Sequence, residues 1–366
     1  MGYVYFPILK TTDAELKAYE HLDIYVKEKI LPIFELTRSR KSSKNVDRSI
    51  YKRLDKIEEL CKDSPFILDL SIDSQLTNDQ IKNILNSPKG GFPEWINLIT
   101  ELKNKNLKVI PVIHYNPYFL DDVATEITEL QKISKYLAFR VDIDDPDIIN
   151  YLQEIQKSCS LSNVILILDA KFIDCRRFAS DASEVFDSTL QNLISVFGYK
   201  KFLGVLCAFS CFPDSVTKYG NDKYGHFLRL EKSTFISLKQ RYGQFINIYP
   251  SDYASVHPIR YDTAGGQWIP RIDFFDDRFA YYYRFRREDG GYVVAAQMTI
   301  QDKNYIPIKE FQVWADDEIN IASKGNPNGS NPSHWISCRV NSYISRNVVE
   351  FKDEVQMTLL DNQDQR

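Results

Sequence analysis

The chain has 366 residues, with 46 Lys and Arg against 50 Asp and Glu, so its formal charge is −4. Its 43% hydrophobic and 26% charged residues are typical of a globular protein, which excludes a mainly disordered or low-complexity chain. The near-neutral charge argues against a nucleic-acid binder that relies on a global positive field, although a local basic patch stays open. The length fits two average domains or one α/β barrel with insertions.

The cysteines and the first residues indicate a cellular compartment. Six cysteines are scattered along the chain without a CxxC pair. The apolar run at residues 3–9 ends at Lys10, so it is too short for a secretory leader or a membrane span. We therefore expect a reduced, soluble, cytoplasmic protein with no membrane partner.

Short apolar runs recur along the first 250 residues. Several of them are near-continuous Val, Ile, Leu and Phe, as is typical of strands covered on both faces in a parallel sheet. We predict eight strands from these runs, at residues 3–9, 30–34, 66–68, 109–113, 136–139, 164–168, 202–209 and 245–249.

Helical signals lie between the runs. Residues 12–15 and 77–80 read as capping boxes, the first one formed by Thr12 and Glu15. An apolar stripe from Val46 to Cys61 has helical spacing, and Pro93 is well placed to open another helix. Similar stripes follow at residues 123–133, 149–155, 185–194 and 230–238.

Eight units of a strand followed by a helix predict a (β/α)8 barrel of the TIM type. An open, doubly wound sheet is the alternative, and it would be expected to carry a glycine-rich first turn. Here the first turn is residues 10–12, which contain no glycine, so the sequence gives no support for dinucleotide binding.

The pattern changes after Pro250. Residues 281–286 and 291–298 flank an Asp-Gly turn at 287–290 and predict a β-hairpin. A helix over residues 308–319 would then close the barrel as its eighth, before a loop of turn formers and a last segment, residues 334–360, that forms a short strand or an extended tail. We thus predict a barrel over residues 1–323, with a hairpin insertion after strand 8 at about 260–300, and a C-terminal loop and tail at 324–366 packed on it.

Polar side chains follow most of the apolar runs, where a barrel places its active site. Counting in twos along each strand adds inward neighbours, because alternate residues of a strand share a face. From these positions we assign catalytic roles to Glu35, Asp69, His114, Asp142 and Asp169, with His114 as general acid or base. The substrate-binding candidates are Lys10, Arg140, Lys171, Asp252 and His257. Salt-bridged networks that only close the top of the barrel are the alternative interpretation.

Three chemistries fit this set. The carboxylates and His114 could hold a divalent cation such as Mg²⁺ or Mn²⁺ and hydrolyse a phosphoester, although no HxH, HxxxH or DxH spacing supports a metal site. Lys171 could form a Schiff base with nearby carboxylates as proton carriers. Alternatively, Lys10, Arg140 and Lys171 could bind phosphate or carboxylate groups without any reaction.

Two local basic segments are candidates for nucleic-acid binding. Residues 38–53 carry seven basic side chains and one acid. Residues 281–287 interleave aromatic side chains with Arg284, Arg286 and Arg287, as single-strand binders do. The alternatives are a solvated loop and an ordinary amphipathic hairpin, and a nucleic-acid site would require both segments on one face.

Several stretches resemble the beta protein family of phages and bacteria. They are Tyr-Phe-Pro-Ile-Leu-Lys at 5–10 with Asp-Ala-Glu-Leu at 13–16, Ile-Leu-Pro-Ile-Phe-Glu-Leu-Thr at 30–37, the segment from Asp252 to Pro258, and the tail around Trp335. The resemblance implies a barrel-like protein of mobile or anti-phage gene neighbourhoods. It brings no established reaction, so Lys10, Glu35, Asp252 and His257 gain weight only as motif positions.

Together these observations lead us to expect a ligand-binding or hydrolytic barrel that acts on a phosphorylated or nucleotide-type substrate in anti-phage defence. The alternative is a non-catalytic recognition or scaffold subunit that binds a phage protein, a partner protein or nucleic acid.

Overall fold

Parallel strands form the centre of the computed structural model, which describes residues 2–43, 45–116, 118–260 and 268–359. Eight of them form one sheet in the order β5-β4-β3-β2-β10-β8-β7-β6. Their bounds are β2 Phe6–Lys10, β3 Ile33–Leu36, β4 Phe66–Leu70, β5 Val109–Pro111, β6 Leu137–Asp142, β7 Val164–Phe172, β8 Gly204–Ser210 and β10 Ile248–Asp252. Each of the eight apolar runs thus contains a strand or overlaps one, as predicted.

The sheet curls until its two edges meet. A parallel bridge joins Val112 to Ala138, and Ile113 N–H donates to the carbonyl of Ala138 at 2.7 Å. This single bridge links the β5 edge to the β6 edge, so the eight strands form a nearly closed parallel barrel. The mixed α/β fold and the barrel are confirmed, and the open doubly wound sheet is wrong.

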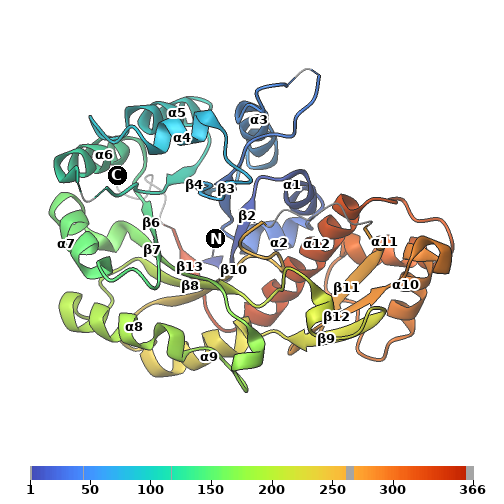
Figure 1. Cartoon of the computed structure of the whole chain (residues 1–366). Helices are drawn as coiled ribbons and strands as arrows, with labels where there is room; N and C mark the ends of the chain where they lie inside the picture. The colour runs from blue at the N-terminus through green and yellow to red at the C-terminus, as the bar shows by residue number, and fades with distance from the viewer. Residues whose placement is uncertain (1, 44, 117, 261–267, 360–366) are drawn as a thin grey trace.

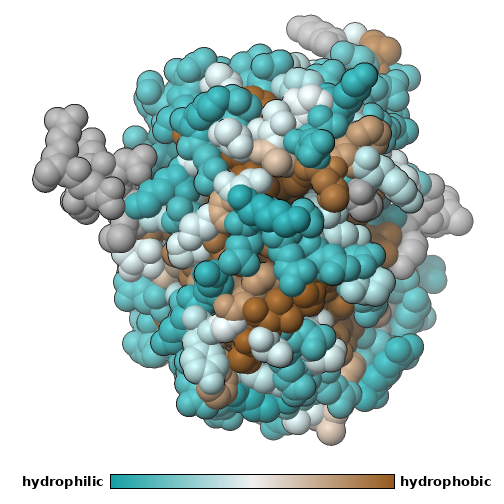
Figure 2. Space-filling view, turned by 90° about the vertical axis from the view of Figure 1, so that its left-hand side faces the viewer, coloured by the Kyte–Doolittle hydropathy of each residue, from teal (hydrophilic) through white to brown (hydrophobic). Residues whose placement is uncertain are grey.

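Helices surround the barrel, as Figure 1 shows in a view along its axis. They are α1 Asp13–Glu20, α2 Ile24–Lys29, α3 Tyr51–Leu60, α4 Asp79–Leu85, α5 Pro93–Asn104, α6 Leu120–Ile133, α7 Ile148–Ser158, α8 Glu184–Phe197 and α9 Glu231–Tyr242. Thr12 caps α1 by accepting from Glu15 N–H. The outer faces of α6, α7 and α8 are on the side seen in Figure 2, which is mainly hydrophilic with scattered hydrophobic residues. None of the described helices combines the length and apolarity that a membrane span needs.

The strand residues divide into two apolar layers because alternate side chains point to opposite faces. Phe6, Ile8 and Ile67 belong to the layer inside the barrel. Leu9 and Leu68 belong to the layer between the strands and the helices. At the amino end of the barrel a short ladder of β1 (Gly2–Tyr3) with β13 (Met357–Thr358) adds side chains to the inner layer.

The segment after β10 forms a module beside the barrel. Its strands β11 (Arg271–Phe275) and β12 (Phe279–Arg284) pair with each other and with β9 (Tyr224–Leu228) as a three-stranded antiparallel sheet. The helices α10 (Gly291–Gln301) and α11 (Trp314–Ser323) pack on each other beside it. Residues 261–267 of the predicted insertion and 360–366 of the predicted tail lie outside the described residues.

The predicted hairpin around residues 287–290 is wrong. A hairpin does follow strand 8, but β12 turns back onto β11 through residues 276–278, where Asp276 accepts from the N–H groups of Arg278 and Phe279. Gly290, at φ 94°, leads instead into α10. Residues 291–298, which we predict as a strand from the sequence, are part of this helix. Its buried side chains have the spacing of a helix face and are Tyr292, Ala295, Ala296 and Thr299.

The short strand or extended tail predicted for residues 334–360 is wrong for most of the segment, because α12 (Pro332–Phe351) is a helix of 20 residues and only β13 is a short strand. Asn331 caps it by accepting from His334 N–H, and Pro332 occupies the first turn, which are start signals present in the sequence. This helix packs on α1 and therefore closes the helical ring. The helix expected over residues 308–319 begins only at Trp314, and the stripe from Val46 becomes helical only at Tyr51.

Candidate functional site

A cavity of about 740 Å³ opens at the carboxyl ends of the barrel strands, within the size range of small-molecule sites. Seven of the ten predicted catalytic and substrate-binding residues line it. These are Glu35, Asp69, His114, Arg140, Asp142, Asp169 and Lys171. The mouth of the barrel therefore brings together side chains from β3, β4, β6 and β7 and from the loop after β5.

The alternation of strand residues explains this convergence. Ile33, Ile67 and Ile167 belong to the inner apolar layer, so the residues two positions further along point the same way. These are Glu35 and Asp69, which lie in register on the neighbouring strands β3 and β4, and Asp169 on β7, further round the barrel. Apolar side chains thus fill the lower barrel, and charged side chains fill its upper end.

Arg140 lies at the centre of this upper layer. Its Nη1 donates to Asp69 Oδ2 at 2.8 Å and to Glu35 Oε2 at 3.1 Å. Its Nε and Nη2 donate to Asp169 Oδ2 at 3.1 and 2.8 Å, and Nη2 also donates to the hydroxyl of Tyr253 at 2.8 Å. All five N–H donors of the guanidinium are used. We call Arg140, Glu35, Asp69, Asp169 and Tyr253 the arginine network.

Burial strengthens this network. The Arg140 side chain is 14% exposed, and those of Glu35 and Asp169 are 5% and 4% exposed. Burial acts to lower the pKa of Arg140, but Tyr253, Asp169, Glu35 and Asp69 together hold that pKa well above its usual value. The Tyr253 hydroxyl donates to Asp169 at 2.6 Å, and burial is the largest cause that raises its pKa. The salt-bridged network of the alternative interpretation is therefore present, and it forms one wall of a cavity.

Lys171 and Asp142 form an ion pair at the rim of the cavity. Both side chains are a little over a third exposed, and Asp142 also accepts from Asp144 N–H at 3.1 Å. Lys171 has a φ of 53°, at a point where the ladder between β7 and β8 is irregular. A left-handed residue that is not glycine costs free energy, and such residues gather at functional sites. The Schiff-base role of Lys171 stays a prediction.

The carboxylate of a buried glutamate, Glu126, lies beside His114. Glu126 of α6 is fully buried, and its carboxylate accepts from His114 backbone N–H at 3.1 and 3.2 Å. The Nδ1 atom of His114 lies 3.3 Å from Glu126 Oε1, while Trp95 and Phe92 hold the ring at centroid distances of 4.8 and 5.4 Å. Burial raises the pKa of Glu126. Among the described groups, the Nε2 atom of His114 has no hydrogen-bond partner, whereas Nδ1 faces the Glu126 carboxylate.

Lys10 and His257 lie outside the cavity wall. Lys10 is 3% exposed, its Nζ donates to the carbonyl of Pro258, and it lies 3.7 Å from Asp73 Oδ2. His257 packs on Phe172 at a centroid distance of 4.7 Å, and burial lowers its pKa. Both residues therefore hold the loop after β10 in place, and neither lines the cavity.

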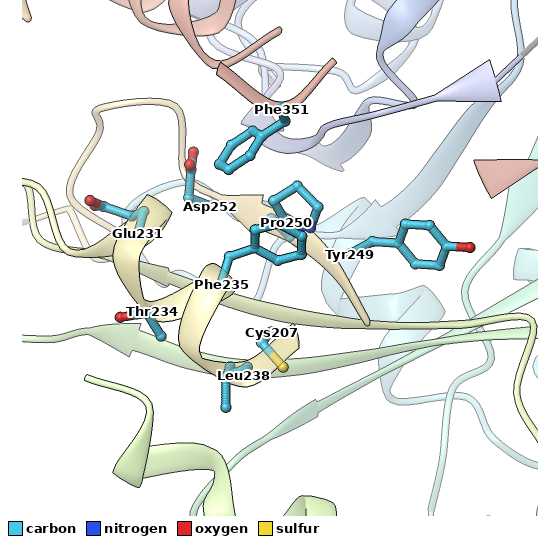
Figure 3. Close-up of a pocket in the computed structure, with 10 residues that line it drawn as sticks. Cys207, Glu231, Thr234, Phe235, Leu238, Tyr249, Pro250, Asp252 and Phe351 are labelled. Atoms are coloured by element: carbon cyan, nitrogen blue, oxygen red, sulfur yellow. The ribbon is translucent and has the colours of Figure 1, made fainter. Parts of the chain in front are cut away.

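The structure contradicts the placement of Asp252 at the mouth. Its side chain points outward from β10 to α12, where it accepts from Tyr5, from Tyr343 at 3.3 Å and from Asn347 at 3.1 Å. It lies near Glu231 at a small separate cavity between β10, α9 and α12 (Figure 3). The cause is strand alternation: the inward residue is Tyr253, one position further along.

The expected Mg²⁺ or Mn²⁺ site does not fit the residues present. Within the described part of the chain, no three or more His, Cys, Asp and Glu side chains are grouped so that they could hold a metal ion. The guanidinium of Arg140 occupies the space between Glu35, Asp69 and Asp169, where a cation would have to bind.

The two basic segments do not form one patch. Residues 38–53 lead into α3, whereas Arg284 ends β12 and Arg286 and Arg287 follow before α10. These elements are well separated in Figure 1. Arg284 also lies 3.5 Å from Asp222, and Arg286 lies 3.8 Å from Glu288. A nucleic-acid site would require both segments on one face, and their positions do not support this arrangement. The recognition or scaffold role stays a prediction.

Several residues of the site were missed in the sequence. Tyr253 follows the last strand and could have been found by counting two positions from Ser251. Glu126 gives no such signal, because it is one acid among several on an amphipathic helix. The loop partners Asp73 and Arg260 meet only in the fold, where Arg260 N–H donates to Asp73 at 2.8 Å.

Comparison with known proteins finds a family model and a curated relative that are similar to nearly the whole chain. A family model described as "Beta protein" matches residues 5–349, from the first strand of the barrel to within α12. The curated "Protein beta" of Enterobacteria phage P4 is 27% identical over 352 residues, which cover 95% of this chain and 93% of the relative. The similarity therefore covers the barrel and the inserted module together.

Proposed function

The chain belongs to the Beta protein family, and from this premise we propose that it is a ligand-binding barrel whose mouth takes up a small molecule. One observation carries the proposal: the cavity of about 740 Å³ at the carboxyl ends of the strands. Barrel proteins place their ligand sites at this end, built from strand ends and the loops after them. An inert barrel has no need of a cavity this large beside a buried charged network.

The arginine network prepares the site for a ligand. Five hydrogen bonds fix the guanidinium, and through it the carboxylates, in one geometry. Rigid polar groups lower the entropic cost of binding. The cavity also has an apolar surface, which is formed by Phe139, Tyr115 and Tyr151. Fixed polar groups that orient a ligand and an apolar surface that packs on it are both features of metabolite sites.

Turnover is a second candidate function, and His114 favours it. The imidazole lines the cavity, and Glu126 lies against its Nδ1 side. A carboxylate beside a histidine orients the ring and determines which ring nitrogen carries the proton, as a general acid or base requires. In this proposal His114→Gln abolishes turnover but leaves ligand affinity within about threefold.

Ligand-observed NMR tests the binding proposal. The probe is a mixture of cationic, neutral and anionic metabolites, offered to the wild-type chain and to Ser74→Trp, which places an indole at the cavity wall. Ser162→Trp is the matched control, because Ser162 is exposed and precedes β7 at the opposite end of the barrel. Signals that Ser74→Trp removes and Ser162→Trp keeps support the proposal. Binding to neither protein, or equal binding to both variants, contradicts it.

We extend the proposal to a role in anti-phage defence, which the phage origin of the relative supports. Plating efficiency of phages on bacteria that express the chain measures this role. Protection by the wild-type chain that Ser74→Trp removes links defence to the mouth. Equal protection by both proteins would show that defence does not depend on the cavity.

A further inference from the structure

The cavity has few free groups that could bind an anion. All five donors of Arg140 are already used within the arginine network. The ammonium of Lys171 is paired with Asp142. The remaining cationic side chain at the wall is that of Arg260, an exposed residue of the loop after β10. A phosphate group would therefore have to displace ion pairs that already exist.

The wall carries more acids than bases. Its carboxylates outnumber its cations six to three, a formal balance of −3, since the cations are Arg140, Lys171 and Arg260. Including Lys10, which lies behind the wall beside Asp73, leaves −2. The carboxylates are Glu35, Asp69, Asp73, Asp142, Asp145 and Asp169. Low-dielectric walls around such a cavity focus a negative potential into it.

The buried carboxylates can also accept further hydrogen bonds. Glu35 Oε1 accepts from the Ser71 hydroxyl at 2.8 Å, and Asp69 Oδ1 accepts from Leu70 N–H at 2.8 Å. A carboxylate offers about four lone-pair sites in all. Glu35 and Asp69 each use two, one on each oxygen, so both can accept from donors of a ligand.

His114 gives independent evidence of a ligand. It is 9% exposed, it lines the same cavity, and its Nε2 atom has no hydrogen-bond partner among the described groups. The carboxylate of Glu126, 3.3 Å from Nδ1, favours the tautomer with its proton on Nδ1. That tautomer leaves Nε2 as an acceptor. A buried polar group without a partner costs free energy, so its presence calls for a donor from outside the chain.

From these observations we infer that the ligand carries a positively charged group with several N–H donors, an ammonium, amidinium or guanidinium, which binds against Glu35 and Asp69. The inference rests on the proposed function, because it names the ligand class of that site. It replaces the phosphorylated substrate expected from the strand-end charges. An aliphatic or aromatic remainder of the ligand would lie along Tyr115 and Tyr151, whose ring centroids are 4.1 Å apart.

Isothermal titration calorimetry with two probes of equal length tests the ligand class. The probes are 1,4-diaminobutane and succinate, which have four carbons each and opposite charges. We expect the diamine to bind the wild-type chain, to bind less well in 0.5 M NaCl, and to lose about tenfold in affinity in Asp69→Asn. Asp63→Asn, an exposed acid before β4, is the control and keeps the affinity of the wild-type chain.

A pair of rim variants keeps the test decisive if Asp69→Asn does not fold. Asp142→Asn removes one acid from the wall and frees the ammonium of Lys171, so it should weaken diamine binding about threefold to tenfold. Lys171→Met removes the cation and should strengthen diamine binding. Both side chains are partly exposed, so folding does not depend on the pair.

The outcomes separate the two proposals. Diamine binding with opposite responses of the two rim variants supports the inference. Succinate binding that Asp142→Asn strengthens would overturn the cationic ligand but keep the ligand-binding barrel. Binding of neither probe overturns the cationic ligand class. The proposal of a ligand-binding barrel is then decided by the NMR experiment with the metabolite mixture.

Discussion

Replacing Arg140 by methionine would show how much the arginine network depends on its one cation. The substitution keeps most of the aliphatic volume but removes all five donors, which leaves Glu35, Asp69 and Asp169 without their common partner. Removing one member of a buried ion pair typically costs about 3–5 kcal/mol. Because three carboxylates lose their partner together, we expect a loss at the upper end, about 5 kcal/mol at pH 8.

The loss should depend on pH. Without Arg140 the buried carboxyls gain folded-state pKa values above their unfolded ones, so the folded variant binds more protons than the unfolded chain. Its stability then falls as pH rises, and the deficit is smaller at pH 5 than at pH 8. Urea denaturation followed by circular dichroism at both values measures it. Arg241→Met, which removes a partly exposed pair with Asp187, should cost less than about 1 kcal/mol. A deficit below about 1 kcal/mol for Arg140→Met, or an equal one at both pH values, would refute the buried network.

Two further predictions concern the outer layer of the barrel. Burial raises the pKa of Asp252 to about 7, above an unfolded value of about 4, so stability should fall as pH rises from about 4 to about 7. Asp252→Asn should flatten this slope in urea midpoints between pH 5 and pH 7.5, and an unchanged slope contradicts the assignment. Phe351→Ala should cost about 3–5 kcal/mol, because Phe351 is 1% exposed and packs on Phe235 at a centroid distance of 5.3 Å. A cost as small as that of Ile306→Ala, at an exposed position, would show that α12 does not close the ring.

The barrel was predictable because it depends on repetition. Eight apolar runs with helical stripes between them have few alternative folds, and strand alternation then directs Glu35, Asp69 and Asp169 to one mouth. These inferences need only local sequence and a period of two residues. Asp252 is predicted at the mouth only as a polar residue after the last apolar run, but it is one position out of phase with the inward Tyr253 and points outward.

The rest depends on contacts between distant segments. Whether Arg140 binds a ligand or carboxylates of the chain depends on which strands the closed barrel brings opposite β6, here β3 with Glu35 and β4 with Asp69, and no local pattern gives that information. The prediction of a hairpin around residues 287–290, in the module after β10, failed for a different reason. Residues 287–290 offer an Asp-Gly turn, but packing of Tyr292 and Ala296 against the neighbouring helices favours a helix over a second strand.

A crystal structure determined with 1,4-diaminobutane tests the central claim most directly. We expect one ammonium group within hydrogen-bond distance of Glu35 or Asp69, with the carbon chain in the cavity beside Tyr115 and Tyr151 and the arginine network unchanged. A diamine bound elsewhere on the surface, with the mouth of the barrel free of it, would contradict a cation-binding site.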